Sequence, residues 1–181
     1  LGAEFAQKLC ICRIVPAREL TLDEIRKICE TGMETEVFVH GAQCMCLSGQ
    51  CYMSAVIGSR SANRGQCAQA CRLPFSAVGK PAEEYALSLK DMSLVRHVDE
   101  LCDIGCASFK IEGRMKRPEY VAAAVTALRN AVDGTGDTDA DMKRLEAVFS
   151  RSGFTDGYLM NRRGADMFGY RRKEDVISAD G

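Results

Sequence analysis

Four thiols in a segment rich in small residues are the first candidates for chemistry in this chain of 181 residues. They are Cys44, Cys51, Cys67 and Cys71. The glycine, serine and alanine residues between them let the backbone fold back, so that the sulfur atoms can approach one another. The sequence contains no Cys-x-x-Cys pair, which disfavours zinc ribbons and thioredoxin-type dithiols. Irregularly spaced thiolates favour an iron–sulfur cluster, with zinc binding and structural thiols as alternatives.

The composition is that of a compact domain with reduced thiols. The chain has 24 Lys+Arg, 25 Asp+Glu and 46% hydrophobic residues. Its net charge of -1 means that RNA binding would need a local basic patch. No apolar run approaches the roughly 18 residues that cross a bilayer, and no secretory signal is recognisable. We therefore expect a cytoplasmic protein, and the start at Leu1 without Met suggests a piece of a longer chain.

The remaining cysteines carry weaker expectations. Cys10, Cys12 and Cys29 lie in apolar patterns and are expected to be buried. Cys46, Cys102 and Cys106 are additional to the four-thiol pattern, and the last two are interpreted as core residues or as one alternative ligand.

Strand-like and helix-like patterns alternate along the chain and predict an α/β fold. Strands are expected at 10–15, 36–40, 85–88 and 107–111, and helices at 21–31, 91–104, 117–132 and 138–149. Thr21 and Glu24 have the spacing of a capping box, and Pro118 suits a first helical turn. Repeated βα units imply parallel strands, but they are too few for a closed eight-unit barrel. We expect a partial TIM-barrel-like domain over 1–133, with the cysteine cluster at 44–71.

Residues 134–181 are expected to form a linker, a short helix and an irregular extension. Arginine and aromatic residues alternate there: Tyr158, Arg162, Arg163, Phe168, Tyr170, Arg171 and Arg172. Such a pattern can bind single-stranded nucleic acid, and the alternative is a solvated tail whose aromatic residues pack on the domain.

Charged residues near the expected strand ends are the candidate catalytic groups, because barrel active sites gather at the carboxyl ends of strands. His40, Lys110, Glu112 and Arg114 are selected on this ground, and Lys90 and Asp91 follow another expected strand. Glu112 and Arg114 could instead form an ion pair at the rim. Near the cysteines, the basic residues Arg60, Arg64 and Arg72 could bind an anionic substrate or offset thiolate charge. His97 is expected at the surface of a helix.

The segment around the first cysteines resembles the peptidase U32 family, which includes collagenase-like proteins and O₂-independent hydroxylases. The family pattern E-x-F-x-x-G-[SA]-[apolar]-C-x₄-G-x-C-x-[apolar]-S is filled by Glu36, Phe38, Gly41, Ala42, Cys44, Gly49, Cys51, Met53 and Ser54. Gln43 departs from the usual apolar residue. The resemblance continues through 60–72, 87–91, 108–116 and 153–159.

The resemblance implies the second half of a TIM-barrel-like catalytic domain with its C-terminal extension. It also implies a [4Fe-4S] cluster on Cys44, Cys51, Cys67 and Cys71. Hydroxylation of RNA bases or quinone precursors would follow, with prephenate as a co-substrate in some RNA-modifying systems. A U32 peptidase acting on peptides is the alternative, although the chain contains neither His-Glu-x-x-His nor Gly-x-Ser-x-Gly. A third reading is a non-catalytic subunit that carries the cluster, and exposed strand edges would favour a homo-oligomer.

Overall fold

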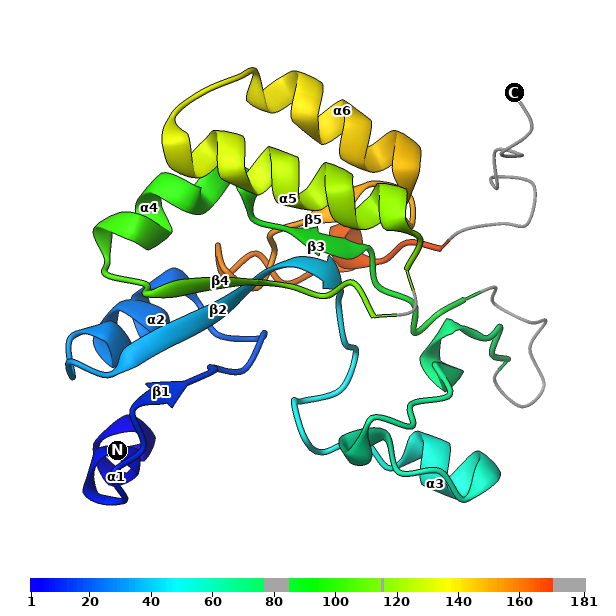
Figure 1. Cartoon of the computed structure of the whole chain (residues 1–181). Helices are drawn as coiled ribbons and strands as arrows, with labels where there is room; N and C mark the ends of the chain where they lie inside the picture. Colours follow the sequence, from blue (N-terminus) through cyan, green and yellow to red (C-terminus); the bar gives the residue numbers. More distant parts are fainter. Residues whose placement is uncertain (77–84, 115, 171–181) are drawn as a thin grey trace.

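A mixed five-stranded sheet organises the protein, as seen in a computed structural model that describes residues 1–76, 85–114 and 116–170 (Figure 1). Its strands are β1 (Arg13–Ile14), β2 (Glu34–Ala42), β3 (Asp91–Ser93), β4 (Ser108–Ile111) and β5 (Phe154–Thr155). The long strand β2 pairs in parallel with β1 and β4 and antiparallel with β3, and β3 pairs in parallel with β5. The end of β2 therefore lies between β3 and β4, whereas β1 pairs with its start.

The helices within 98–148 cover one face of the sheet, and the cysteine segment extends from the opposite side (Figure 1). The α-helices are α1 (Gly2–Lys8), α2 (Leu22–Cys29), α3 (Met53–Gly58), α4 (Val98–Asp103), α5 (Pro118–Asp133) and α6 (Thr138–Val148). Short 3₁₀ turns occupy Ala62–Arg64, Ala70–Arg72, Val95–His97 and Ala165–Met167. Helices α4, α5 and α6 cover one face, whereas α3 belongs to a lobe that extends from the opposite side (Figure 1). In the described part of the chain, no helix is long and apolar enough to cross a membrane.

Local sequence signals place several helix ends as expected. Thr21 caps α2 in a full capping box with Glu24. Pro118 occupies the first turn of α5, and Gly134 ends that helix in the left-handed conformation at φ 64°. Asp137 caps α6 by accepting from the amides of the first turn.

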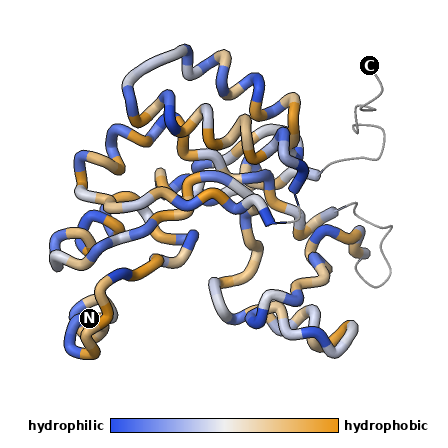
Figure 2. Tube along the Cα trace, viewed as in Figure 1, coloured by the Kyte–Doolittle hydropathy of each residue, from blue (hydrophilic) through white to orange (hydrophobic). Residues whose placement is uncertain are grey.

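The core lies between the sheet and the helices. Val39, Leu101, Ala124 and Leu145 are fully buried there. Figure 2 shows apolar residues along the central strands, and further apolar residues on the cysteine lobe. On that lobe Val56 and Ile57 are exposed, so α3 does not contribute to the core.

Three expectations about the fold are wrong. The sheet is mixed rather than parallel, because β2 and β3 run antiparallel. Residues 85–88 form a turn rather than a strand. Residues Asp91–Ser93 form β3 rather than the start of a helix, because they pair with β2 and are buried on both faces. Three residues are too few to show the period of a strand, and Met92 has helical spacing to Val95.

Gly41 is required where β2 and β4 approach each other. Its φ is 140°, and a Cβ built there would lie 2.6 Å from the Cβ of Glu112. We expect Gly41→Ala to lower the free energy of unfolding by about 2–4 kcal/mol, since both backbone strain and steric overlap oppose it.

Gly58→Ala is the matched control, because a Cβ at Gly58 meets nothing within 4 Å. Urea denaturation of both variants tests the prediction. Equal midpoints for Gly41→Ala and the natural protein would contradict it.

Candidate functional site

The structure brings the four predicted thiols together beyond the end of β2. Cys44 follows β2 and Cys51 precedes α3. Cys67 lies between the two 3₁₀ turns that follow α3, and Cys71 lies in the second of them. The charges of Cys44, Cys67 and Cys51 all act on Cys71. Burial raises the pKa of Cys71, and Arg72 opposes that rise. Thiols that are 4 to 27 residues apart in the sequence thus lie near one another around Cys71.

Cys46 is a fifth thiol at this cluster. Burial is the main cause that raises the pKa of Cys46. The charges of Cys51 and Cys44 and a hydrogen bond with Cys51 raise it further. The four-thiol pattern read from the sequence did not include Cys46, although only one residue separates Cys46 from Cys44.

The other cysteines lie elsewhere. Cys29 and Cys106 approach to 4.0 Å between their sulfur atoms, near the start of β2. Burial raises the pKa of Cys106 to about 12, which fits the expected core role. Cys102 is exposed, so the core interpretation fails for it. Cys10 and Cys12 are also exposed, contrary to expectation, because the strand after them has only two residues and does not cover them.

Arg72 fastens the cysteine lobe to the sheet. Its guanidinium donates hydrogen bonds to the carbonyl of Gln43 at 2.6 Å, to Ser88 Oγ at 2.9 Å and to the carbonyl of Leu89 at 2.5 Å. These acceptors are protein groups, so Arg72 acts as a structural clamp beside Cys71. Its donors are not held ready for a substrate anion.

Two further contacts hold the lobe. The Glu19 carboxylate accepts from the amide and the hydroxyl of Ser48, at 2.8 and 2.9 Å. Ser54, which is buried, accepts from the amide of Ala68 at 3.0 Å. Both contacts position the loops that carry cysteines.

Arg60 and Arg64 are exposed on the lobe. Within the described residues, neither side chain has a hydrogen bond or an ion pair. They remain candidate contacts for an anionic substrate.

The charged residues at the end of β4 have structural partners. Lys110 pairs with Glu36 at 2.8 Å. Glu112 pairs with Arg18 at 2.7 Å rather than with Arg114. Arg114 instead donates to the carbonyl of Gly65 at 3.2 Å, and so joins β4 to the cysteine lobe.

His40 is the predicted catalytic residue with the most unusual surroundings. It is 1% exposed and lies 5.4 Å, between ring centroids, from both Tyr120 and Phe154. Neither ring nitrogen has a hydrogen-bond partner in the described part of the chain. Burial, followed by the charge of Lys116, lowers the pKa of His40 to about 4. Its imidazole is therefore neutral at pH 7.

Asp91, Arg151 and Tyr120 complete a buried polar cluster beside His40. Asp91 pairs through Oδ1 with Arg151, while its Oδ2 lacks a partner among the described residues. Burial raises the pKa of Asp91, against the charges of Arg151, Lys116 and Arg72. Burial also raises the pKa of Tyr120, whose hydroxyl donates to the carbonyl of Glu112 at 3.3 Å.

The sequence marked Asp91 only as a residue after an expected strand. Arg151 and Tyr120 carried no local signal, because the parallel pairing of β3 with β5 and the packing of α5 bring them to the site.

The lowered pKa of His40 makes stability depend on pH. The folded state resists protonation while the unfolded chain titrates near 6.5, so acid favours unfolding. We expect the free energy of unfolding to fall by up to about 3 kcal/mol as the pH falls from 6.5 to 4. The variant His40→Phe should lack this acid-induced loss of stability. Denaturation midpoints of both proteins between pH 6.5 and 4 measure the difference. An unchanged acid dependence in His40→Phe would contradict the assignment.

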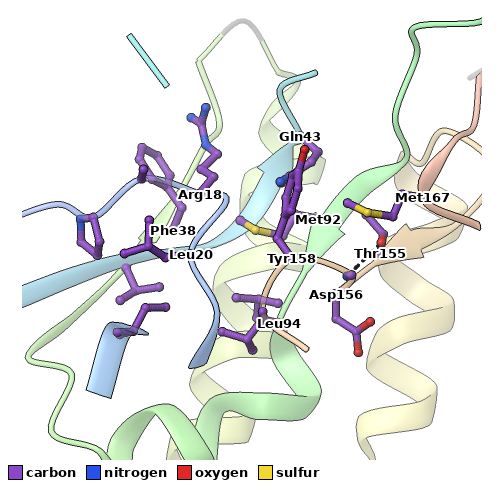
Figure 3. Close-up of a pocket in the computed structure, with 16 residues that line it drawn as sticks. Arg18, Leu20, Phe38, Gln43, Met92, Leu94, Thr155, Asp156, Tyr158 and Met167 are labelled. Atoms are coloured by element: carbon purple, nitrogen blue, oxygen red, sulfur yellow. Dashed lines mark hydrogen bonds between the residues drawn. The ribbon is translucent and has the colours of Figure 1, made fainter. Parts of the chain in front are cut away.

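Two cavities flank the end of β2. The first, about 20 Å³, is lined mostly by apolar residues, with Arg18 and Phe38 on one side and Met167 on the other (Figure 3). It has room for about one water molecule. The second is an open cleft of about 400 Å³ between the cysteine segment and the C-terminal segment. Only the second has the volume of a ligand site.

The family model of peptidase family U32 matches residues 1–168. The chain belongs to this family. It is 37% identical to the 23S rRNA 5-hydroxycytidine C2501 synthase of Escherichia coli, over 98% of this chain and 28% of that protein. It is 36% identical to a collagenase of Porphyromonas gingivalis, over 83% of this chain and 42% of the relative. It is 39% identical to tRNA hydroxylation protein P1 of Bacillus subtilis, over 73% of this chain and 34% of the relative.

This U32 chain thus spans less than half the length of these relatives. No solved structure matches it. The U32 relatives include proteins named for RNA hydroxylation and proteins named collagenase.

Proposed function

We propose that this U32 chain is part of an iron–sulfur-dependent, oxygen-independent hydroxylase that acts on RNA bases. The observation that carries the proposal is the convergence of Cys44, Cys51, Cys67 and Cys71 on one site. The relatives named for rRNA and tRNA hydroxylation support RNA as the substrate class.

The donor set fits a [4Fe-4S] cluster better than a single zinc ion. All four donors are thiols, and among the described residues no three His, Cys, Asp or Glu side chains are grouped closely enough to hold one metal ion. A cluster places each thiolate on a different iron, so its donors lie farther apart. The amide of Gln69 donates to Cys67 Sγ at 3.3 Å, and hydrogen bonds to sulfur of this kind tune cluster potentials.

When bound, the cluster would supply one-electron redox chemistry at the end of β2. The protein's own residues give this place a positive surrounding, because the charges of Arg72 and Arg151 act on each other and on buried Asp91. The positive charge of Arg72 also stabilises the thiolate form of Cys71. Burial raises the pKa of Asp91, which makes this carboxyl the candidate for proton exchange there.

Arg60 and Arg64 are the proposed contacts for RNA phosphates or for the carboxylates of prephenate as co-substrate. Both arginines are exposed on the lobe that carries the thiols. Bidentate contacts to such anions suit guanidinium groups.

The second candidate function is a U32 peptidase, favoured by the relatives named collagenase. Cysteine proteolysis needs a thiol within hydrogen-bonding reach of a base. His40 has no hydrogen-bond partner in the described part of the chain, and His97 bonds to Asp156 at 2.9 Å and Glu100 at 3.3 Å. Neither histidine is placed to activate a cysteine.

Parallel RNA-binding and peptide-cleavage assays on the full-length, cluster-loaded protein separate the two candidates. We expect RNA binding that weakens as salt rises, and no cleavage of gelatin. Cleavage of gelatin that survives Cys67→Ser, without RNA binding, would favour the peptidase.

A further inference from the structure

The open cleft of about 400 Å³ has one wall from the cysteine segment and another from the C-terminal segment. Met45, Cys46 and Leu47 line the first wall, and Tyr158, Arg163 and Phe168 line the second. The two walls are more than 100 residues apart in the sequence, so only the folded chain creates this cleft.

The cleft adjoins the thiol cluster. Cys46 lines it and hydrogen bonds with Cys51. The charge of Cys44 also acts on the hydroxyl of Tyr158. A molecule in the cleft would therefore lie beside the residues proposed to hold the cluster.

The walls of the cleft suit a flat ring. Tyr158 and Phe168 offer aromatic faces, and Met45 and Leu47 add exposed apolar surface. Stacking on aromatic side chains is the usual way in which proteins hold unpaired bases.

Arg163 adds a place for an anion. It is the one basic residue among those that line the cleft, and it lies 5.6 Å above the centre of the Tyr158 ring. One of its N–H groups donates to the carbonyl of Glu19 at 3.2 Å, which orients the guanidinium while leaving other donors. The Glu19 carboxylate accepts from the amide and the hydroxyl of Ser48, which hold it against the cysteine segment.

We propose that this cleft binds the target nucleotide of the RNA substrate, with the base stacked on Tyr158 or Phe168 and a phosphate on Arg163. The inference rests on the proposed function and deepens it, since it places the base to be hydroxylated next to the thiol cluster. Arg163 and Phe168 are binding residues in this proposal.

Crosslinking of a single-stranded RNA that contains 5-iodouridine to the full-length, cluster-loaded protein tests the placement. We expect the crosslinked peptide to contain Tyr158 or Phe168. Loss of stacking should weaken RNA binding by about tenfold in Phe168→Ala. Arg163→Ala should weaken it by about three- to tenfold, with partial recovery in Arg163→Lys.

Arg129→Ala is the matched control, because Arg129 pairs with Asp133 on α5 and does not line the cleft. Its RNA affinity should stay within twofold of the natural protein, and circular dichroism confirms that each variant folds. Two results together would overturn the proposal that the cleft binds the nucleotide: unchanged RNA binding in Phe168→Ala and Arg163→Ala, and crosslinks only around Arg60 or Arg64. The proposed function would then remain intact. No RNA binding by the natural protein would overturn both.

Discussion

Replacing Cys67 by serine should remove iron and acid-labile sulfide from the anaerobically purified protein. The natural protein should contain about four irons and four sulfides per chain, as a cube with four thiolate ligands requires. Because Cys67 is one of four thiols whose charges act on one another, its loss leaves the cluster one ligand short. The same result is expected for serine at Cys44, Cys51 or Cys71, and absorption near 400 nm reports it alongside chemical analysis.

Cys12→Ser is the control, because Cys12 is exposed and lies outside the cysteine lobe. It should keep full iron content. Cys46→Ser is the sharper comparison, since Cys46 touches Cys51 but is not among the proposed ligands. Full iron in Cys67→Ser, or loss in Cys46→Ser alone, would contradict the ligand assignment.

Arg72→Ala should give the largest loss of stability among the charged residues of the lobe. The substitution leaves the carbonyls of Gln43 and Leu89 and the hydroxyl of Ser88 without their donor. It also removes a cation that balances Asp91. Since several buried polar groups lose their partner at once, we expect the free energy of unfolding to fall by about 3–5 kcal/mol.

Arg72→Lys restores the charge without the forked geometry, so it should recover only part of the loss. Arg60→Ala is the control, because Arg60 is exposed and makes no side-chain hydrogen bond or ion pair to the residues that the structure covers. Guanidinium denaturation measures all three variants. A midpoint for Arg72→Ala equal to that of Arg60→Ala would show that Arg72 is not a clamp.

Helices with local start and stop signals were predictable from the sequence. The capping box of Thr21 and Glu24, the first-turn Pro118 and the terminal Gly134 each act within a few residues. Strand β3 was not predictable in this way, because it has only three residues, Asp91–Ser93, and its single apolar residue Met92 also fits the apolar spacing of the helix that follows. Its antiparallel pairing to β2 depends on contacts about 50 residues away in the sequence.

The thiol cluster was predictable because cysteine is chemically distinctive and the chain between the thiols is rich in small residues. The buried partners of the site were not. Asp91 and Arg151 are 60 residues apart and meet only because β3 and the segment before β5 are neighbours. Lys110 and Glu112 were selected as strand-end residues, but each is paired with a charge from another segment.

The family pattern has physical reasons that the structure makes visible. Gly41 leaves room for Glu112, and Ser54 is buried where it accepts from the amide of Ala68. Glu36 accepts from Lys110 and from Ser108, and so joins β2 to β4. These motif residues shape the strand end and the lobe on which the thiols lie.

Nucleoside mass spectrometry of RNA from anaerobically grown cells tests the central claim most directly. Cells that lack the full-length protein should lose one hydroxylated nucleoside, which the natural gene restores and Cys67→Ser does not. Cys12→Ser should restore it as well as the natural gene. An unchanged nucleoside profile in cells without the protein, or full restoration by Cys67→Ser, would contradict a cluster-dependent RNA hydroxylase.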